Sequence, residues 1–375
     1  MANLIDNIAS IAKIVGADNL VSDDEAKQVY GLDWTRFYSP APLCVVFPKS
    51  VEIVQALVLF AGKNAISLVP SGGRTGLSGG AVACDGEVVV SFDKMNQVLE
   101  FDPIDQVVTV QPGLVTEALQ QFAEDQGLFY PVDFASAGSS QIGGNLATNA
   151  GGIKVLQYGL TRDWVVGLKV VTGAGELLDL NRSLIKNATG YDLRHLFVGS
   201  EGTLGFIVEA SMKLARKPHN LTVALLAVPD MTNIISVMTQ FREHVELTAF
   251  EFFSDKALKH VLAHSELSRP FTDPSAFYAL IEFDQRNAAV MDAALAAFES
   301  CVESGIAVDG VISQSEQQRK GIWRYREGIS EAITSHTPYK NDVSVRVSKV
   351  PAFLKAVDAT VTSAYPEFEI VWFGH

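Results

Sequence analysis

Three glycine-rich clusters, each lying next to an apolar run, are the feature of this 375-residue sequence that most restricts its fold. They extend over residues 70–80, 138–152 and 199–205, and five of the eleven residues from Pro70 to Gly80 are glycine. Glycine lets the backbone adopt positive φ and lets a ligand approach the main chain closely. Consecutive N–H groups in such loops can converge into a concave site for an anion.

We interpret the first cluster as a cradle for a pyrophosphate group. In the second cluster Ser and Asn alternate with the glycines, so hydrogen-bonding side chains lie beside permissive backbone. The alternative interpretation is a β-rich domain whose corners are tight turns. That alternative requires three independent turns of unusual glycine content in one domain.

The charge balance excludes one class of partner. The chain has 43 acidic against 29 basic residues, a formal net charge of -14. Nucleic acid is therefore not expected as a partner, because binding phosphates along a strand needs a basic face. An anionic cofactor or substrate must instead be held by backbone N–H groups and a few placed Arg or Lys side chains.

Cysteine spacing and hydropathy indicate the compartment. Cys44, Cys84 and Cys301 are far apart in the sequence and form no C-x-x-C pair, which is typical of a reducing compartment. The N-terminus lacks the basic start of a secretion signal, and no run approaches the about 20 apolar residues of a membrane span. We expect a cytoplasmic protein, peripheral to a membrane at most through its electron acceptor.

The order of expected elements indicates two domains. Up to about residue 217 the pattern is mixed, with no strict alternation of strands and helices. The expected strands there cover 43–47, 65–69, 87–92, 98–101, 106–110, 165–172 and 176–180, and the expected helices begin after Ser50 and at Thr116. Beyond 217 we expect strands near 221–228, 247–253, 277–283, 306–312, 343–347 and 368–373, and helices near 231–243, 254–264, 287–304, 315–335 and 351–363. The predicted domains are therefore 1–217 and 218–375.

The clusters resemble those of the flavoprotein family related to vanillyl-alcohol oxidase and p-cresol methylhydroxylase. Residues 70–80, 142–152 and 199–205 match that family's motifs in order, and the similarity extends over the whole chain. The branch it most resembles is the FAD-linked D-2-hydroxyacid dehydrogenases. The resemblance implies an α+β fold: a two-subdomain FAD-binding domain of the p-cresol methylhydroxylase type, followed by an α+β cap domain with an antiparallel sheet that binds substrate.

The same resemblance implies how FAD is held. The first cluster would enclose the pyrophosphate, and the other two would line the isoalloxazine and ribityl groups. The implied cofactor residues are Pro70, Ser71, Gly72, Gly73, Arg74, Thr75, Gly76, Leu77, Ser78, Gly138, Ser139, Gly143, Gly144, Asn145, Thr148, Asn149, Gly151, Gly152, Glu201, Gly202 and Ile207. No histidine occurs in the first cluster, so we expect non-covalent FAD. An NAD-binding Rossmann motif is disfavoured, because Gly173-Ala174-Gly175 lacks the third glycine.

A polar helix in the second domain carries the candidate substrate residues. Ser315 to Gln318 fits a capping box at its start, and Arg326 and Ser330 are four residues apart, so that both face the same way on a helix. By resemblance, Arg326, Ser330 and Lys340 would hold a substrate carboxylate. The alternative for the two cations is ordinary solvated charge. Ser330 replaces the threonine expected in the family, which leaves the preferred acid length open.

The last residue is the predicted metal ligand. By resemblance, His375 begins a longer motif for a divalent metal, with zinc as the expected ion, and we expect the chain to be a truncated piece that binds flavin but turns over poorly. No catalytic residue is assigned, since we expect it beyond His375. The other six histidines show no metal-ligand spacing and are interpreted as structural or surface residues.

The resemblance implies an FAD-dependent dehydrogenase that oxidises a D-2-hydroxyacid, foremost D-2-hydroxyglutarate to 2-oxoglutarate, by hydride transfer to the flavin with metal assistance. The expected partners are the hydroxyacid, an electron acceptor (quinone, electron-transfer flavoprotein or cytochrome) and, as a compatible assembly, a second copy in a homodimer. The alternatives that the same motifs allow are a D-lactate dehydrogenase, a glycolate oxidase flavin subunit, a flavin-binding subunit without chemistry of its own, and a flavin-dependent alcohol oxidase that uses oxygen.

Overall fold

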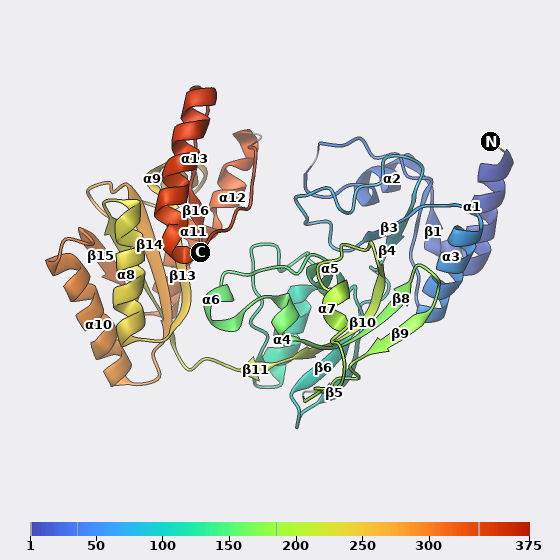
Figure 1. Ribbon diagram of the computed structural model, residues 1–375, viewed down its shortest axis with the longest axis horizontal. Coiled ribbons are helices and arrows are strands. Elements are labelled where there is room, and N and C mark those ends of the chain that lie inside the picture. Colours follow the sequence, from blue (N-terminus) through green and yellow to red (C-terminus); the bar gives the residue numbers. More distant parts are fainter. Residues whose placement is uncertain (1, 36, 185, 337) are drawn as a thin grey trace. The chain divides into compact units, whose positions relative to one another are not determined.

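A computed structural model describes residues 2–35, 37–184, 186–336 and 338–375. The chain divides into two compact units (Figure 1). Unit 1 comprises residues 1–152 and 159–217, and unit 2 comprises residues 153–158 and 218–375. The short segment 153–158 therefore leaves unit 1, packs with unit 2 and returns. The expectation of two consecutive domains did not include this excursion.

The first sheet of unit 1 delivers the first glycine cluster. Its order is β1-β2-β4-β3, and β2, β4 and β3 run parallel. The strands are β1 (Leu20–Val21), β2 (Cys44–Val46), β3 (Leu68–Ser71) and β4 (Val88–Ser91), and the helices beside them are α1 (Ala2–Val15), α2 (Asp24–Tyr30) and α3 (Val51–Lys63). Ser50 begins α3 because its Oγ accepts a hydrogen bond from the N–H of Ile53. The buried residues of α1 and α3 pack on β2 and β4 in one core.

The second sheet of unit 1 carries the other two clusters. It is antiparallel, in the order β5-β6-β10-β8-β9. Its strands are β5 (Val98–Asp102), β6 (Val107–Val110), β8 (Val165–Thr172), β9 (Leu177–Leu180) and β10 (Gly205–Lys213), while β7 (Leu128–Phe129) pairs with β11 (Ala215–Arg216). The helices are α4 (Thr116–Asp125), α5 (Ile142–Ala147) and α7 (Arg194–Phe197), and α4 and α5 share a core with β6, β8 and β10.

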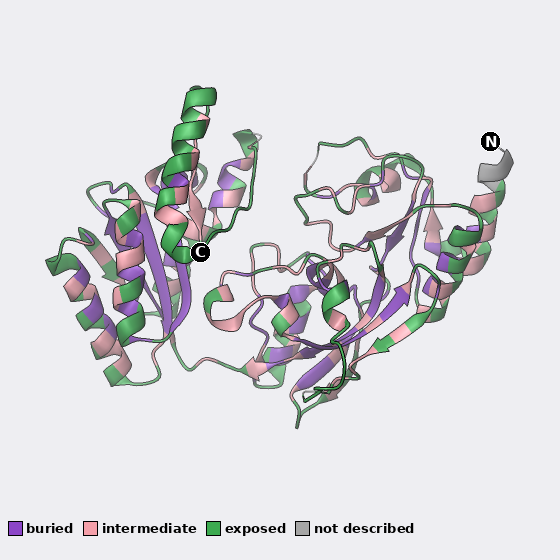
Figure 2. Cartoon of the chain, in the orientation of Figure 1, coloured by how far each residue is buried: buried purple, intermediate pink, exposed green. Residues whose placement is uncertain are grey.

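Unit 2 is built on one antiparallel sheet in the order β15-β12-β14-β13-β16. The strands are β12 (Leu221–Val228), β13 (Leu247–Ser254), β14 (Phe277–Asp284), β15 (Asp309–Ile312) and β16 (Phe373–Gly374). One core joins the sheet to α8 (Met231–His244), α10 (Ala288–Glu303) and α13 (Val350–Ala364). A second core joins it to α9 (Asp255–His264), α11 (Glu316–Glu327) and α12 (Ile329–Ala332). Figure 2 shows the central strands buried between these helices.

Two carboxylates break the apolar pattern of this sheet. Along β14, Ala279, Ile281 and Phe283 belong to the core with α8 and α10, whereas Tyr278 and Leu280 belong to the core with α9, α11 and α12. Because side chains alternate between the faces of a strand, Glu282 projects toward α11. Glu251 on β13 projects to the same face, and both carboxylates have 0% exposed surface. Buried charges of this kind need paired partners.

The structure corrects three predicted elements of unit 2. The expected helix 315–335 is divided at Gly328 into α11 and α12. The expected strand 343–347 does not form, and these residues belong to none of the described sheets. The expected strand 368–373 shrinks to β16, since its partner β13 ends at Ser254 and leaves earlier residues nothing to pair with.

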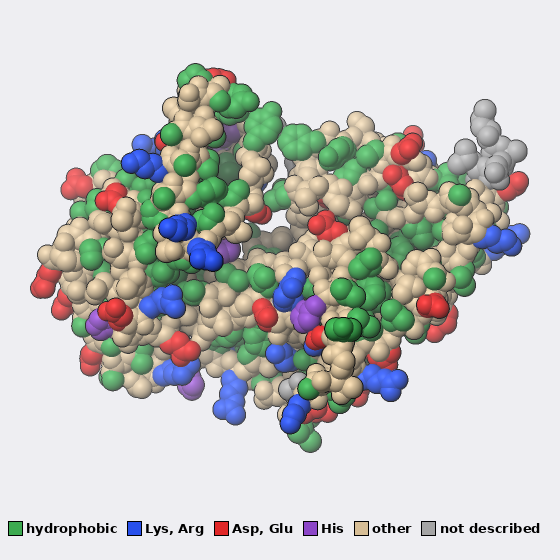
Figure 3. Space-filling view, viewed as in Figure 1, with side chains coloured by type: hydrophobic (Ala, Val, Ile, Leu, Met, Phe, Trp, Pro, Cys, Tyr) green, Lys and Arg blue, Asp and Glu red, His purple; other side chains and the backbone are tan. Residues whose placement is uncertain are grey.

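The charge on the surface and the length of the helices were both subjects of sequence-based expectations. On the face seen in Figure 3, Lys and Arg side chains are interspersed with Asp and Glu. None of the described helices combines the length and the apolar character needed to cross a bilayer.

Candidate functional site

The first glycine cluster follows β3 and is held by one buried aspartate. Asp33, 6% exposed, accepts hydrogen bonds from the N–H of Thr35 at 2.9 Å and from the N–H of Gly79 at 2.7 Å. Beside it, the N–H of Trp34 donates to the carbonyl of Gly76 at 2.9 Å. The loop is therefore fixed at its far end as well as by the strand that leads into it.

The structure brings the three predicted clusters together within unit 1. The N–H groups of Gly199 and Glu201, in the third cluster, donate to the carbonyls of Leu146 and Ala147, in the second, at 2.9 Å each. A Cβ on Gly72, in the first cluster, would lie 3.7 Å from the Cα of Gly144. The three clusters, which are far apart in the sequence, are thus neighbours in the folded unit 1.

Close packing explains several of these glycines. An ideal Cβ on Gly73 would overlap the carbonyl oxygen of Ser139, one on Gly152 that of Asp133, and one on Gly202 the ring of Pro70. Gly144 differs, because no heavy atom lies within 4 Å of its ideal Cβ. Packing therefore does not require glycine at this position, and the open space allows a ligand to approach the backbone.

Each cluster also contains one strained residue, among eight non-glycine residues with positive φ in the described chain. Arg74 (φ 58°), Asn149 (φ 49°) and Glu201 (φ 49°) all adopt the left-handed region without being glycine. Such residues cost of order 1–3 kcal/mol each and gather at ligand sites. The strain is held in place locally, since Asn149 Oδ1 accepts a hydrogen bond from the N–H of Arg162 at 3.1 Å.

Arg74 is the cation of the first cluster, and its surroundings are acidic and aromatic. Its Nη1 donates to the carbonyl of Gly72 at 3.0 Å and lies 3.7 Å from Asp93 Oδ2. Its guanidinium stacks 4.5 Å from the centre of the Tyr30 ring. Asp93 also accepts a hydrogen bond from Gln141 Nε2 at 2.7 Å, which joins the first cluster to the second. The charge on Arg74 is thus partly balanced within the protein.

Some predicted cofactor residues face the core instead. Asn145 Nδ2 donates to Thr116 Oγ1 at 2.7 Å, and Thr116 Oγ1 lies 2.8 Å from Ser140 Oγ, in a buried network. Ile207 is buried in the core of unit 1. These residues shape the site through packing and backbone. The predicted cofactor residues with exposed surface are Gly76, Leu77, Ser78, Gly138, Ser139, Thr148, Gly151 and Glu201.

These observations match a bound dinucleotide such as FAD. The backbone of three segments converges, Gly144 is open, and the buried Ser71 Oγ and Gln141 Oε1 have no hydrogen-bond partner among the described residues. Backbone N–H groups can hold a pyrophosphate in an acidic protein, since each hydrogen bond to a charged group contributes about 1.5–3 kcal/mol. That the first cluster forms the anion cradle and the second and third form the remaining walls stays a prediction.

In unit 2, the predicted substrate arginine is paired with a buried acid. Arg326 Nε lies 2.7 Å from Glu251 Oε2, and the Arg326 side chain is 12% exposed. Its guanidinium carbon lies 4.9 Å from the centre of the Phe373 ring. The alternative of a freely solvated charge is therefore wrong for Arg326. Nη1 and Nη2 donate to no described residue, so the fork of the guanidinium keeps its donors for a ligand.

Ser330 and Lys340 lie close to each other. Lys340 Nζ donates to the carbonyl of Ser330 at 3.3 Å. Partial burial lowers the pKa of the Lys340 ammonium, and nearby Asp342 opposes that shift. Gly328 separates α11 from α12 between Arg326 and Ser330, with its backbone still in the right-handed helical region (φ -69°, ψ -11°). A Cβ on Gly328 would lie 3.0 Å from the carbonyl oxygen of Arg324, so a larger residue would crowd the turn.

His375 faces the same buried carboxylate as Arg326. Its Nδ1 lies 3.3 Å from Glu251 Oε1, and this interaction raises the pKa of the imidazole although partial desolvation opposes the shift. Among the described residues, no group of three or more His, Cys, Asp or Glu side chains could hold a metal ion. The histidine pair His260 and His336 packs edge to face at 5.0 Å, and His260 Nε2 lies 2.6 Å from Glu369, as expected of structural residues.

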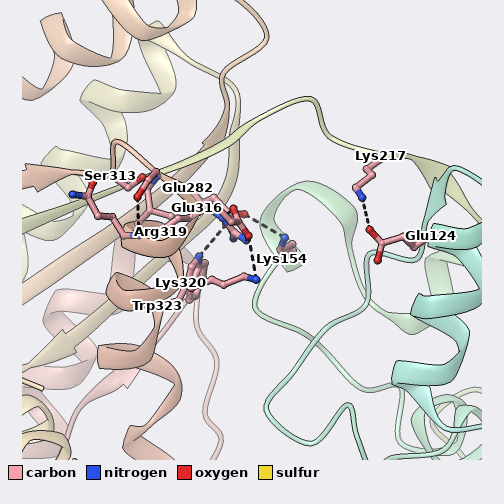
Figure 4. A network of polar contacts seen from close by, with 12 residues as sticks. Glu124, Lys154, Lys217, Glu282, Ser313, Glu316, Arg319, Lys320 and Trp323 are labelled. Atoms are coloured by element: carbon pink, nitrogen blue, oxygen red, sulfur yellow. Dashed lines mark hydrogen bonds and ion pairs between the residues drawn. The ribbon is translucent and has the colours of Figure 1, made fainter. Parts of the chain in front are cut away.

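Glu251 and Glu282, the two buried acids of unit 2, were not predicted from the sequence. Glu282 accepts hydrogen bonds from Thr248 Oγ1 at 2.8 Å, Trp323 Nε1 at 2.9 Å and Arg319 Nη1 at 3.2 Å (Figure 4). Thr248 contacts Oε1, and Lys154 Nζ, from the segment 153–158, lies 3.4 Å from the same oxygen, whereas Trp323 and Arg319 contact Oε2. A glutamate inside an otherwise apolar strand was the available signal, present in both Phe250–Phe253 and Ala279–Phe283.

Comparisons with known proteins agree with the geometry. Residues 42–181 match the family model for the FAD binding domain, and residues 217–375 match the model for the C-terminal domain of FAD linked oxidases. A D-2-hydroxyglutarate dehydrogenase of Stutzerimonas stutzeri is 59% identical over 98% of this chain and 79% of its own length. One from Xanthomonas citri pv. viticola is 53% identical over 98% of this chain and 78% of its own.

A solved structure supports the fold. The crystal structure of p-cresol methylhydroxylase with substrate bound superposes with a TM-score of 0.70 at 16% identity, covering 88% of this chain and 73% of that one. At this identity the likeness concerns the fold alone. The predicted fold class, an FAD-binding domain of this type followed by a domain with an antiparallel sheet, is confirmed.

Proposed function

The chain belongs to the FAD-linked oxidases of the vanillyl-alcohol oxidase and p-cresol methylhydroxylase family, and from this premise we propose that it oxidises D-2-hydroxyglutarate to 2-oxoglutarate. The observation that carries the substrate is the 59% identity to a D-2-hydroxyglutarate dehydrogenase over 98% of the chain. The family enzymes share an FAD-dependent oxidoreductase chemistry, and the converging glycine clusters of unit 1 fit that cofactor.

The residues of unit 2 suit a dicarboxylic acid. Arg326 presents its guanidinium fork, with Nε held by Glu251 at 2.7 Å, and Lys340 is a second cation beside Ser330. A fork and a point charge bind carboxylates in different ways, so one substrate carboxylate for each is the natural division. D-lactate and glycolate have one carboxylate and would use only one of the two cations. This favours a hydroxyacid with two carboxylates over both alternatives.

The chain's own part in the reaction is binding and orientation. When bound, FAD supplies the two-electron acceptor for the hydride that leaves C2 of the hydroxyacid. Oxidation also releases the hydroxyl proton, and we assign no base to it among the described residues. The buried Glu251 keeps Arg326 in one orientation, so that the substrate carboxylate is fixed relative to the reacting carbon. Non-covalent attachment of FAD, from the lack of histidine in residues 70–80, is part of the proposal.

Metal assistance remains a prediction. A divalent ion on the C2 hydroxyl would ease loss of its proton, and His375 is the predicted ligand. The described residues do not complete such a site, so no step above depends on a metal. Dialysis against EDTA tests it: activity should fall and return with zinc while the flavin spectrum stays unchanged. Activity that is unchanged after dialysis against EDTA would show that the reaction needs no metal ion.

The electron acceptor and assembly are also proposals. Quinone, electron-transfer flavoprotein and cytochrome are the acceptor classes that we propose, with a homodimer as the assembly. An oxygen-using alcohol oxidase is the second candidate function, favoured only by the shared fold. Formation of hydrogen peroxide in stoichiometry with substrate would select it, and reduction of an artificial dye without peroxide would select the dehydrogenase.

The deciding experiment is anaerobic flavin bleaching. Purified protein with bound FAD is mixed with D-2-hydroxyglutarate, L-2-hydroxyglutarate, D-lactate or glycolate, and absorbance of oxidised flavin is followed. We expect bleaching by the D-diacid alone, lost in Arg326→Met and kept in Arg324→Met, whose side chain on the same helix is exposed. Protein that takes up no FAD, or equal bleaching by D-lactate, would overturn the proposal.

A further inference from the structure

Segment 153–158 connects the second glycine cluster to unit 2. It begins directly after Gly151 and Gly152, and it is the part of the chain between the two stretches of unit 1 that packs with unit 2. Its helix α6 (Val155–Tyr158) lies beside β13, and Ile153 packs against the core that also contains α11. Only two peptide bonds separate Gly152 from Lys154, so a displacement of the cluster backbone is transmitted to Lys154 along the main chain.

The Lys154 side chain ends beside a buried carboxylate. The residue is 8% exposed, and its Nζ lies 3.4 Å from Oε1 of Glu282. On its other oxygen, Glu282 accepts hydrogen bonds from Arg319 Nη1 and Trp323 Nε1, both of α11 (Figure 4). Glu282 thus joins Lys154 to α11 by contacts that are all within hydrogen-bond or ion-pair distance.

The same face of α11 carries the proposed substrate arginine. Arg319, Trp323 and Arg326 are spaced i, i+4 and i+7, which places them along one side of a helix. Arg319 and Trp323 contact Glu282, and Arg326 contacts Glu251, so two buried carboxylates of the sheet fix the helix along that side. Buried ion pairs add little net stability but make one arrangement much better than its neighbours.

From this chain of contacts we propose that Lys154 is a positioning residue: through Glu282 it links the second glycine cluster to α11, so that FAD binding and hydroxyacid binding assist each other. The proposal rests on the function proposed above. FAD that orders residues 149–152 also orders Lys154, and an ordered Lys154 holds Glu282 and α11 in one arrangement. Coupling of this kind is reciprocal, because each ligand then binds a site that the other has already ordered.

The variant that tests the link is Lys154→Met. It keeps an apolar stem of similar length, and Glu282 retains Arg319, Trp323 and Thr248, so the fold is expected to survive. The matched control is Lys320→Met, which removes a 70% exposed cation from α11 that pairs only with Glu316 among the described residues. Lys154→Arg keeps the charge and should restore the behaviour of the wild type.

The measurement is amide hydrogen exchange on full-length apoprotein with and without added FAD. In wild type, Lys154→Arg and Lys320→Met, FAD should slow exchange across residues 316–327 by about fivefold, the lower end of typical coupling. In Lys154→Met that slowing should vanish, although FAD still protects residues 71–78 and 143–152. Circular dichroism shows whether each variant is folded.

Two results would overturn the coupling: α11 protected by FAD to the same degree in Lys154→Met, or no protection of α11 in a wild type that has bound FAD. Failure of the proposed function looks different. In that case the wild type takes up no FAD, or D-2-hydroxyglutarate fails to bleach it, and the glycine clusters show no change in exchange.

Discussion

The Nε atom of Arg326 lies 2.7 Å from Oε2 of Glu251, a carboxylate with 0% exposed surface. The same carboxylate has His375 Nδ1 3.3 Å from its other oxygen. A single buried acid therefore sets the orientation of the proposed substrate arginine and of the predicted metal ligand. Its charge also keeps a cation stable at a position where only 12% of the side chain is exposed.

Removal of Glu251 should destabilise the protein. Glu251→Ala leaves the Arg326 guanidinium buried without a counter-charge, so we expect the free energy of unfolding to fall by about 3–5 kcal/mol. Glu251→Gln should lose less, because its amide oxygen still accepts from Nε. Urea unfolding measures both. Glu243→Ala, at an exposed acid of α8, is the control and should stay within about 0.5 kcal/mol of wild type. Equal stability of Glu251→Ala and wild type would contradict the pairing.

Gly144→Ala separates a packing role from a ligand role. Ala is favoured over Gly in a helix by about 1 kcal/mol, and the added Cβ meets nothing within 4 Å, so the apoprotein should be as stable as wild type or more so. If FAD approaches this backbone, its Kd should rise about tenfold or more, as measured by flavin fluorescence titration.

The control for that substitution is Gly62→Ala in α3. This glycine is also helical and also open, so it should gain stability without any change in FAD affinity. Unchanged FAD affinity in Gly144→Ala would show that the open space beside Gly144 lies away from the cofactor.

Asp255 makes stability depend on acid pH. Burial alone raises the pKa of this carboxyl, but hydrogen bonds from Arg269, Lys259 and Tyr278 outweigh burial and hold the pKa below its ordinary value of 3.8. A depressed folded pKa gives stability that is present above the unfolded pKa and is lost as pH falls through the folded one. Asp255→Asn should therefore cost about 1–2 kcal/mol near pH 7 and progressively less below pH 3.8.

Urea unfolding of wild type and Asp255→Asn at a series of pH values measures this difference. Asp292→Asn, at an exposed position of α10, should show none of it. A stability gap between Asp255→Asn and wild type that is the same at pH 7 and in strong acid would show that charge on Asp255 plays no part.

Lys340 should set an alkaline limit on substrate affinity. Because burial lowers the pKa of its ammonium, the charge is lost at a lower pH than for an ordinary lysine at 10.5. We expect KM for D-2-hydroxyglutarate to rise with pH on approaching that value while kcat changes less, since only binding is affected. Lys340→Arg, which stays charged, should flatten the rise in KM. An identical pH profile in both proteins would remove Lys340 from the substrate site.

Local patterns were sufficient for most elements. Ser50, Ser254 and Ser315 each accept a hydrogen bond from the backbone three residues on, as helix-starting residues do. The hairpin of β8 and β9 forms around Gly173–Gly175 as predicted. At Ser315 the capping box is incomplete, because Gln318 Oε1 accepts from the N–H of Gln314 instead of from that of Ser315.

The misses have a common cause, which is that the deciding partner is remote in the sequence. The alternation of Val343, Val345 and Val347 predicts a strand, yet all three are exposed and pair with no described strand. In the sequence, Glu251 and Glu282 are single acids within apolar strands, and their partners on α11 are evident only in the folded structure. The meeting of the glycine clusters was expected only from the family resemblance, since no spacing rule brings three such loops together.

The excursion of residues 153–158 has a consequence for biosynthesis. During translation Lys154 leaves the ribosome well before β14 is synthesised. Its ammonium group therefore stays solvated until Glu282 has been synthesised and the sheet of unit 2 forms. Unit 2 therefore cannot be cut out cleanly at Pro218. A fragment that starts there would enclose a carboxylate with one of its cations missing, and it should refold less readily than the same fragment supplied with a peptide of residues 153–158.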